Sequence, residues 1–542
     1  MTTLASIIRD SLNNVNRYKL DLTQSLGDAV EISKKAILHE GDLPIAGIRG
    51  PPGTGKTKVM EGLVHNEEVM DELLDGKKFI YVAPTNELTT SGLARALIPI
   101  IQILGGSEPS IDKILSKIRI YGSAIPSPYF GNDLNELKMV AGVSDDVLKK
   151  TLKKMVSGGI DDATFIFTTS YQSVSSKMRG SDYKFVLFVD EASKMPFHLP
   201  FNPLSDAQLT ALAQGNPGVL HGLVIVGDER QAVAVGPEYQ GYGKSLLALP
   251  KIEKILRRLG SKQFMTLDTT FRLPEPTQQP IGEGFYEDTG IQLKAIEDAE
   301  KRLGNRLRDI DWIEGLNRCR NLVSDKGNLW RKVIDSVESA LSSFIPVIMV
   351  NTENFIKPGE NSEPLRVKLA TYYALSLKCS LGNNVGISVI APYIDLVEDT
   401  RYYLRKMIGG ANVNIRFLTV QSMLGGEDDI IISLLGKEWS AGANDDEGET
   451  IYFREPENLN VQFSRHRLML IAIGNLQKLR NSAAKAAQIE RLRGLHTEAS
   501  RIRKTIDTLL GLAGISANEN KQVRNLEPYK EGEHAIFMKV DQ

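Results

Sequence analysis

The sequence predicts an α/β protein in which parallel strands alternate with helices, and three observations support this class. A glycine-rich octet, residues 50–57, stands between an apolar run and a stretch with helical potential. Two later apolar runs, 185–189 and 223–226, each lead into acidic residues, and a second series of strand-like runs begins at Val347. Strands that end in functional groups and are separated by helical segments are typical of a parallel sheet whose site lies at its carboxyl edge.

Local patterns predict the elements in chain order. Apolar spacing indicates a helical segment over residues 1–40 and a long helix or helix pair over 476–512. Clusters of Gly, Pro and Ser indicate an inserted subdomain at 104–162, and alternating charge indicates a second, mostly helical insertion at 273–343. The predicted strands are 43–48, 78–83, 185–189, 223–226, 347–350, 387–391, 430–434 and 468–473.

Length and composition limit the class of protein. A chain of 542 residues is too long for one core, which favours about three to four domains or subdomains. A hydrophobic content of 42% and a charged content of 24% are typical of a globular protein. The formal net charge of −2 gives no overall attraction to nucleic acid, so any such binding must come from a local groove.

Cysteine content and hydropathy exclude several classes of protein. The two cysteines, Cys319 and Cys379, are far apart in sequence and have no partners at metal-ligand spacing. We therefore expect no zinc module, iron–sulfur cluster or disulfide framework. Because no apolar run approaches the ~20 residues of a membrane span, we predict an intracellular protein, cytoplasmic or nuclear, without membrane association.

The glycine-rich octet has the pattern of a phosphate-binding loop, G-x-x-x-x-G-K-[ST], in the strand–loop–helix context that gives the pattern weight. Glycines let successive backbone N–H groups point into one concavity, where a triphosphate meets the positive end of a helix. Lys56 would reach the β and γ phosphates, and the Thr57 hydroxyl would hold Mg²⁺. An ordinary glycine-rich turn is the alternative. The predicted phosphate-binding residues are Gly50, Pro51, Pro52, Gly53, Thr54, Gly55, Lys56 and Thr57.

Acidic and amide side chains after two apolar runs suggest hydrolysis. Asp190 can hold Mg²⁺ through its water shell, and Glu191 can polarise the attacking water as general base. Gln231 could hydrogen-bond the γ-phosphate or the attacking water. Taken alone, such strings more often mark a solvated strand end or a polar turn, but the upstream phosphate loop favours the hydrolytic interpretation.

Seven strings resemble, in sequence order, motifs I to VI of superfamily 1 helicases, and most of all those of the Upf-like branch. The resemblance covers residues 47–475, most of the chain. Besides the phosphate loop, the strings are Ala83-Pro-Thr-Asn86, Asp190-Glu-Ala-Ser193, Gly227-Asp-Glu-Arg-Gln231, Thr270-Phe-Arg-Leu-Pro274, Val420-Gln-Ser-Met-Leu-Gly-Gly-Glu-Asp-Asp429 and Asn460-Val-Gln-Phe-Ser-Arg-His-Arg467.

The resemblance implies two RecA-like P-loop NTPase domains in tandem, with inserted, mainly helical subdomains. ATP with Mg²⁺ would bind in the cleft between the domains, and single-stranded RNA or DNA would lie across their other edge. The expected segments are an N-terminal helical segment (1–40), a first RecA-like domain (41–272) with an insertion at about 104–162, a helical insertion (273–343), a second RecA-like domain (344–475) and a C-terminal helical extension (476–542).

The family's two arginines at the γ-phosphate match Arg272 and Arg465. A planar guanidinium delivered by the second domain stabilises the developing phosphoryl charge only when the cleft is shut, which makes hydrolysis depend on closure. The alternative for each arginine is a salt bridge at the surface or between domains. The resemblance thus completes a predicted catalytic set of Glu191, Gln231, Arg272 and Arg465.

Other motif residues receive secondary roles from the resemblance. Glu427 matches a ribose-hydroxyl acceptor of relatives, with a solvated face as the alternative. Arg467 matches a second arginine of the last motif and is expected to be structural. His466 replaces a small residue and could tune nearby groups, although a packed or bonded histidine is the commoner case. Residues placed where relatives touch the nucleic-acid backbone are Pro84, Thr85, Asn86, Thr168, Thr169, Tyr393, Thr419 and Ser422.

Two functions remain open from the sequence. The first is an ATP-dependent helicase or translocase on single-stranded nucleic acid, with 5′ to 3′ motion as the resemblance implies. The second is an NTPase switch of the same fold that remodels or recruits a protein partner with little unwinding. The Arg/Lys-rich extension after Asn475 is expected to contact a protein partner or nucleic acid. RNA and DNA are not distinguished, because the expected contacts touch the backbone, and a preference for the 2′-hydroxyl depends on a few groups that the sequence does not place.

Overall fold

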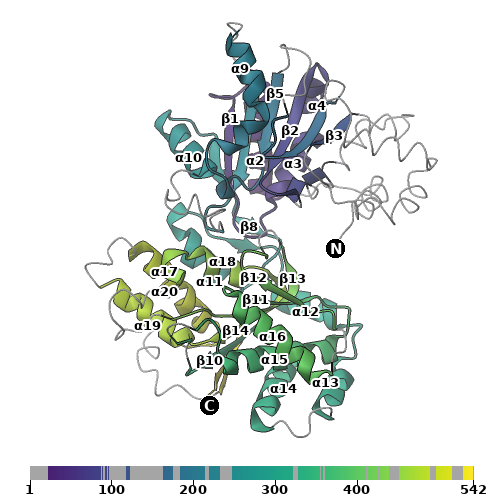
Figure 1. Cartoon of the computed structure of the whole chain (residues 1–542), viewed down its shortest axis with the longest axis vertical. Helices are drawn as coiled ribbons and strands as arrows, with labels where there is room; N and C mark the ends of the chain where they lie inside the picture. Colours follow the sequence, from purple (N-terminus) through teal and green to yellow (C-terminus); the bar gives the residue numbers. More distant parts are fainter. Residues whose placement is uncertain are drawn as a thin grey trace, which may run out of the picture. The chain divides into compact units, whose positions relative to one another are not determined.

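A computed structural model divides the chain into two compact units (Figure 1). The first comprises Met1–Gly50 and Gly55–Leu267, and the second comprises Pro51–Thr54 and Asp268–Gln542. The structure describes residues 22–86, 88–89, 92–93, 96, 117–121, 163–174, 184–213, 219–231, 247–321, 327–354, 356–357, 360–409, 413–423, 426–438, 451–488, 496–515 and 529–540.

A parallel seven-stranded sheet forms the centre of the first unit, in the order β3-β4-β2-β5-β6-β1-β7. Its central strands are almost wholly buried, as expected for a parallel sheet covered on both faces. The strands are β1 (Ile45–Arg49), β2 (Lys77–Ala83), β3 (Ile118–Tyr121), β4 (Phe165–Thr169), β5 (Lys184–Val189), β6 (Leu220–Gly227) and β7 (Phe264–Thr266).

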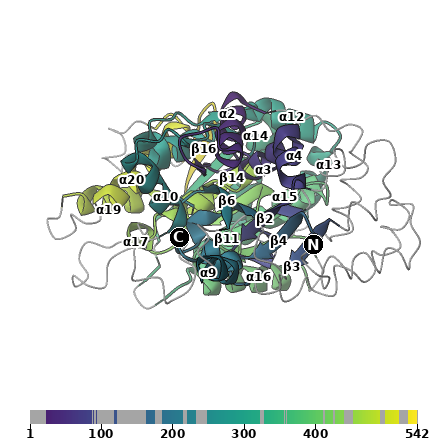
Figure 2. The same cartoon turned by 90° about the horizontal axis from the view of Figure 1, so that it is seen from above.

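Helices cover both faces of this sheet. In Figure 2, α2, α3 and α4 lie on one side and α9 on the other. Side chains cap two of them: Thr23 accepts a hydrogen bond from the Leu26 N–H, and Asn66 accepts one from the Val69 N–H. The helices are α2 (Gln24–Leu38), α3 (Lys56–His65), α4 (Glu67–Leu74), α9 (Ser205–Ala213) and α10 (Ala248–Arg258), with 3₁₀ turns η3 (Ala192–Lys194) and η4 (Leu199–Leu204).

The second unit contains another seven-stranded sheet, in the order β12-β11-β13-β14-β10-β16-β15. All its strand pairs are parallel except β15 with β16. The strands are β10 (Val347–Thr352), β11 (Ile387–Ala391), β12 (Arg416–Thr419), β13 (Asp428–Leu434), β14 (His466–Gly474), β15 (Tyr529–Glu531) and β16 (Ala535–Val540). A two-stranded pair, β8 (Thr269–Thr270) with β9 (Lys294–Ala295), precedes it.

Helices also surround the second sheet (Figure 1). Helix α15 packs on β11, β13 and β14, whereas α18 contacts β13 and β14, and α19 contacts β10. The helical elements are α11 (Gln279–Ile281), the π-helix η7 (Gly282–Tyr286), η8 (Glu287–Thr289), α12 (Ala299–Leu307), α13 (Trp312–Asn321), α14 (Gly327–Ser342), α15 (Pro364–Leu381), α16 (Ile394–Met407), α17 (Ile451–Arg454), α18 (Glu457–Phe463), α19 (Leu476–Ala486) and α20 (His496–Gly511).

The predicted α/β class is confirmed by these two mostly parallel sheets. Every strand predicted from an apolar run is present, within a few residues of its expected ends. The predicted insertion at 104–162 lies outside the described residues except for 117–121, which include the edge strand β3. The other domain boundaries stay predictions.

The prediction that residues 476–542 are wholly helical is wrong. Residues 476–512 do form the helix pair α19 and α20, but β15 and β16 follow. Strand β16 pairs in parallel with β10, so the end of the chain becomes part of the second sheet. Its apolar run, Ile536-Phe-Met538, is buried. None of the helices in the described part of the chain combines the length and the apolar character that a membrane span needs.

The two cysteines, distant in sequence, meet in the fold. Helices α13 and α15 pack so closely that a Cβ on Gly315 would lie 2.4 Å from the Cys379 carbonyl oxygen. This approach brings the thiol of Cys319 into hydrogen-bond contact with that of Cys379, and both are free cysteines.

Candidate active site

The phosphate-loop octet forms the turn between β1 and α3. Gly53 and Gly55 have φ angles of 70° and 81°, a left-handed conformation that glycine adopts without steric penalty. Helix α3 begins at Lys56, so its first N–H groups border the loop, where they can bind an anion. The Lys56 ammonium donates to the Gly50 carbonyl over 2.8 Å. The Gly50 N–H in turn donates to the Gly227 carbonyl at the end of β6.

The tip of this loop is held by β8 and the residues that follow it, within the second unit. Thr270 Oγ1 donates to the Pro52 carbonyl over 2.8 Å, and the Phe271 N–H donates to the Gly53 carbonyl over 2.9 Å. A Cβ on Gly53 would lie 2.3 Å from Arg272 Cβ. The backbone of Arg272 therefore lies directly against the candidate phosphate loop.

Asp190 stands at the end of β5 and is only 3% exposed. Its Oδ2 accepts from the Tyr81 hydroxyl over 2.7 Å and lies 3.4 Å from Thr57 Oγ1. Burial, followed by the negative charge of Glu191, raises the pKa of Asp190. A cation at this point would favour the charged carboxylate, so the pair of Asp190 and Thr57 fits a Mg²⁺ site. Mg²⁺ binds through one or two protein oxygens plus phosphate and water oxygens. Within the described residues, no group of three or more His, Cys, Asp or Glu side chains is arranged to hold a metal ion by itself.

Glu191 has an unusual backbone conformation, with φ 52° in the left-handed region. Such conformations cost energy in residues other than glycine and cluster at functional sites. Its carboxylate lies 3.2 Å from the Lys194 ammonium and is 13% exposed. The turn approaches β6 closely: Ser193 Oγ accepts from the Asp228 N–H over 2.8 Å, and a Cβ on Gly227 would lie 2.8 Å from the Ser193 N. Ser193 thus joins the ends of two strands.

Gln231 follows the end of β6 and is buried. Its amide Nε2 donates to the Asp228 carboxylate. Asp228 therefore holds Gln231 in a fixed orientation near the carboxyl edge of the sheet. Among the residues predicted from the sequence, Asp190, Glu191 and Gln231 come together at this edge, as adjacent strands β5 and β6 require.

Sequence analysis missed an ion-pair network beside the loop. Arg49, the residue before the octet, donates from Nε to Glu229 over 3.1 Å and also pairs with Glu253. Its side chain is 6% exposed and lies over the Phe264 ring at 5.2 Å. An arginine at the end of an apolar strand, with acidic residues after β6, is the signal that could have indicated it.

The second unit holds both predicted phosphate arginines, Arg272 and Arg465, together with Arg467. Arg272 Nε donates to Glu427 Oε2 over 2.7 Å, and its Nη1 donates to the Ser464 carbonyl over 3.3 Å. Arg467 pairs with the other Glu427 oxygen. Arg465 is 2% exposed in the turn between α18 and β14, and its carbonyl accepts from the Asp428 N–H.

A further arginine, Arg302 on α12, was not predicted. Its Nη1 donates to the carbonyls of Arg272 and Arg467 over 2.5 Å and 3.1 Å, and its Nη2 donates to the Phe271 carbonyl over 3.2 Å. Its Nε donates to Glu297 over 3.1 Å. Arg302 thus fixes the backbone of both arginines that bind Glu427.

His466 is fully buried and packed. Its Nε2 shares a 2.8 Å hydrogen bond with Thr277 Oγ1. Burial, followed by the positive charges of Arg302 and Arg272, lowers the pKa of His466 to about 3. The ring is therefore neutral near pH 7, and the bonded histidine expected as the commoner case is the one observed.

The residues predicted to touch nucleic acid form one group in each unit. In the first, β2 and β4 pair side by side, so Thr168 and Thr169 lie at the same sheet edge as the 84–86 segment. Thr85 and Asn86 are exposed, whereas Thr168 and Thr169 are buried. Thr85 Oγ1 accepts from the Leu88 N–H, as in a turn or helix cap.

In the second unit, β11 pairs with β12, and the predicted contacts follow both strands. Thr419 and Ser422 are near the surface and share a 3.0 Å hydrogen bond between hydroxyls. Tyr393 is half-buried, and its hydroxyl accepts from the Lys437 N–H over 3.4 Å. The Lys437 ammonium lies 5.6 Å from the centre of the Tyr393 ring. Hydroxyls, a lysine and an aromatic ring thus gather at one sheet edge.

Comparisons with known proteins concern the fold alone. The sequence matches no protein-family model and no curated protein. Solved structures similar to this chain include a PRRSV helicase, at 13% identity and a TM-score of 0.34, with 84% of this chain and 56% of that chain covered. They also include the DUF1998 helicase MrfA bound to DNA, at 12% identity and a TM-score of 0.35, with coverage of 86% and 50%. MrfA bound to DNA and AMPPNP matches at 11% identity and a TM-score of 0.37, with coverage of 90% and 52%. The chain thus aligns with about half the length of these structures.

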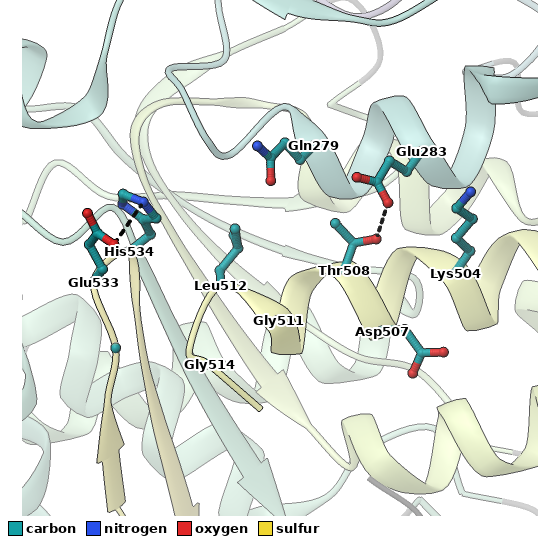
Figure 3. A pocket seen from close by; sticks show the side chains of 11 residues that line it. Gln279, Glu283, Lys504, Asp507, Thr508, Gly511, Leu512, Gly514, Glu533 and His534 are labelled. Carbon is teal, nitrogen blue, oxygen red and sulfur yellow. Dashed lines mark hydrogen bonds and ion pairs between the residues drawn. The ribbon is translucent and has the colours of Figure 1, made fainter. Parts of the chain in front are cut away.

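A pocket of about 590 Å³ lies elsewhere in the second unit (Figure 3). It is lined by α11, η7, α20 and the turn between β15 and β16. Its polar groups bind one another: Thr508 donates to Glu283 over 2.9 Å, and His534 lies 3.9 Å from Glu533. None of the predicted site residues lines it, so we assign it no ligand.

Proposed function

We propose that this protein is an ATP-dependent helicase or translocase that acts on single-stranded nucleic acid, with 5′ to 3′ motion. The observation that carries the proposal is the contact between Arg272 and the phosphate loop. Thr270 and Phe271, the two residues before Arg272, are hydrogen-bonded to the G-x-x-x-x-G-K-[ST] loop, and Arg272 itself lies against Gly53. An arginine in such a position can sense and stabilise the terminal phosphate.

The phosphate chemistry is divided among the other residues at the loop. Lys56 and the α3 N-terminus would bind the phosphates, and Thr57 with Asp190 would hold Mg²⁺. When bound, Mg²⁺ neutralises charge on the β and γ phosphates. Glu191 accepts a proton from the attacking water, which Gln231 orients. Arg272 and Arg465 stabilise the charge that develops on the transferred phosphoryl group.

Polar residues at two sheet edges supply the nucleic-acid path. The hydroxyls and amide of Thr85, Asn86, Thr419 and Ser422 lie at or near the surface. They suit contacts to a sugar–phosphate backbone without reading base sequence. Tyr393, beside Lys437, offers an aromatic face on which a base can stack. Such contacts hold the strand and release it as the nucleotide cycle proceeds. A protein partner for the C-terminal extension stays a prediction.

Strand separation distinguishes this proposal from the NTPase switch. RNA and DNA duplexes with a single-stranded tail at either the 5′ or the 3′ end are incubated with the protein, ATP and Mg²⁺, and strand release is followed by fluorescence. We expect release from 5′-tailed duplexes and none when ATP is replaced by a non-hydrolysable analogue. ATP hydrolysis without release from any of the four duplexes would favour the switch.

A further inference from the structure

We propose that Glu427 is a positioning residue: it orients the guanidinium of Arg272 for catalysis and does not bind the ribose, while Arg302 fixes the backbone of the same site. The inference rests on the proposed function, because it concerns how Arg272 acts on the terminal phosphate. It replaces the ribose contact that the family resemblance implies for Glu427 with a role that the contacts of this chain support.

Both oxygens of Glu427 are engaged by arginines. Oε2 accepts from Arg272 Nε over 2.7 Å, and Oε1 pairs with Arg467. Charge-assisted bonds of this kind are about twice as strong as neutral ones. Burial alone would raise the pKa of Glu427, yet the two arginines bring it down to about 2, so the carboxylate is charged at every working pH. A ribose hydroxyl would have to compete with two cations for the same oxygens.

The contacts of Arg272 fix the plane of its guanidinium. Nε is held by Glu427, and Nη1 is held by the Ser464 carbonyl. Because a guanidinium is planar, two fixed nitrogens define the direction of the third, Nη2. The Cβ of the same residue stands at the Gly53 bend of the phosphate loop. Contacts at both ends of the Arg272 side chain therefore restrict its rotation. The Nη2 amino group remains to donate to a phosphate.

The Arg302 side chain supports the same residues by binding their backbone carbonyls. It donates to the carbonyls of Phe271, Arg272 and Arg467, and Glu297 holds it through Nε. Its side chain is 15% exposed. The adjacent Lys301 is 71% exposed and makes only a 3.9 Å ion pair with Glu297. One guanidinium thus ties the segment after β8 to the start of β14, the two segments that Glu427 joins through side chains.

Positioning and ribose binding predict different kinetics. A hydrogen-bond donor that stabilises developing charge raises kcat. The size of this effect depends on the position of the donor to within about 1 Å. Loss of Glu427 should therefore lower kcat and leave KM for ATP nearly unchanged. Loss of a ribose contact should instead weaken binding of ATP and remove the preference for ATP over deoxy analogues.

The experiment measures kcat and KM for ATP, 2′-deoxy-ATP and 3′-deoxy-ATP with wild type, Glu427→Gln and Glu427→Ala. We expect Glu427→Ala to lower kcat by about 10- to 100-fold and to change KM by less than about 3-fold. The ratio between ATP and the deoxy analogues should stay at its wild-type value. Glu427→Gln keeps an acceptor oxygen and should recover part of the rate. A raised KM with unchanged kcat, or loss of the preference for ATP, would overturn the proposal.

Arg302 and Lys301 give a matched pair. Arg302→Ala should lower kcat as Glu427→Ala does, whereas Lys301→Ala should leave it unchanged. An equal change in kcat for both substitutions would contradict a specific role of the Arg302 side chain.

A thermal-unfolding cycle without nucleotide tests the contact independently of catalysis. The losses in Tm for Arg272→Ala and Glu427→Ala should not add in the double variant, because either substitution removes the pair. Additive losses would contradict the proposal. If the wild type hydrolyses no nucleotide, the proposed function fails, and this cycle alone decides whether Glu427 holds Arg272.

Discussion

The Thr57 hydroxyl lies 3.4 Å from Asp190 Oδ2, although the two residues are 133 positions apart in the chain. Thr57 belongs to the first turn of α3, and Asp190 ends β5. Their approach follows from a parallel sheet in which β1 and β5 both flank β6, so that their carboxyl ends share one edge. A hydroxyl and a buried carboxylate at that edge, beside a glycine-rich loop, form the core of the proposed nucleotide site.

Loss of the Lys56 ammonium should strongly weaken nucleotide binding. The ammonium now lies on the Gly50 carbonyl, within the loop that would hold the phosphates. We expect Lys56→Ala to weaken binding of a fluorescent ATP analogue by more than about 10-fold, as loss of a charged phosphate contact does. Lys58→Ala, on the same helix, is the control. Binding of similar strength by Lys56→Ala and wild type would show that the loop is an ordinary turn.

The Glu191 carboxylate should be needed for turnover and not for binding. Glu191→Gln keeps the size of the side chain but removes the base that would accept a proton from water. We expect a decrease in kcat of at least about 100-fold, with nucleotide affinity close to that of the wild type. Steady-state hydrolysis and equilibrium binding are measured on the same preparation. Normal turnover by this variant would remove Glu191 from the mechanism.

Gly53 should be intolerant of any side chain. An alanine there would suffer a left-handed backbone, at about 1–2 kcal/mol, and a collision with Arg272, whose Cβ would be 2.3 Å away. Gly76 has a φ of 84° but open space around its Cβ position. We expect Gly53→Ala to lose most ATPase activity and Gly76→Ala to retain it, with only a modest decrease in Tm. Equal activity of the two variants would mean that the loop tip does not depend on Arg272.

The neutral His466 ring should make stability depend on pH. In the folded chain the pKa of His466 is lowered to about 3, against an ordinary value of 6.5. Below pH 6.5 the unfolded chain therefore binds more protons than the folded chain, and the free energy of unfolding decreases as pH falls toward 3. Between pH 7 and 5 this loss amounts to about 2 kcal/mol.

Thermal unfolding of wild type and His466→Gln at pH 7 and pH 5 checks this expectation. Gln can still share a hydrogen bond with Thr277 but does not titrate in this range. The variant should therefore lose less stability on acidification than the wild type. His65→Gln, at an exposed position of α3, provides the control. The same decrease in Tm for wild type and His466→Gln would contradict the assignment.

Much of the fold could be predicted because the strands of a buried parallel sheet are continuous apolar runs. Residues 185–189 and 430–434 are examples, and both are strands in the structure. Strands β3 and β12 have four residues each, and each contains an arginine. Neither therefore forms an apolar run long enough to be recognised as a strand in the sequence. Strand β16 escaped prediction because the basic helices before it suggested that the whole extension was helical.

The candidate site was predictable where its chemistry is local in sequence. The loop, Asp190 and Glu191 are each encoded in a short string beside a strand. The partners of Glu427 are not, because Arg272 is 155 positions away and the pairing depends on tertiary structure. Arg302 binds three backbone carbonyls, and main-chain acceptors are the same at every residue, so no sequence pattern could indicate it.

The proposed coupling of ATP hydrolysis to nucleic acid is tested by the rate of ATP hydrolysis with and without single-stranded polynucleotide. The wild type and Lys56→Ala are assayed side by side with Mg²⁺, with no polynucleotide, with single-stranded RNA and with single-stranded DNA. We expect that at least one polynucleotide raises the wild-type rate several-fold, and that Lys56→Ala shows no hydrolysis under any condition. A wild-type rate that neither polynucleotide changes, or hydrolysis that persists in Lys56→Ala, would contradict this expectation.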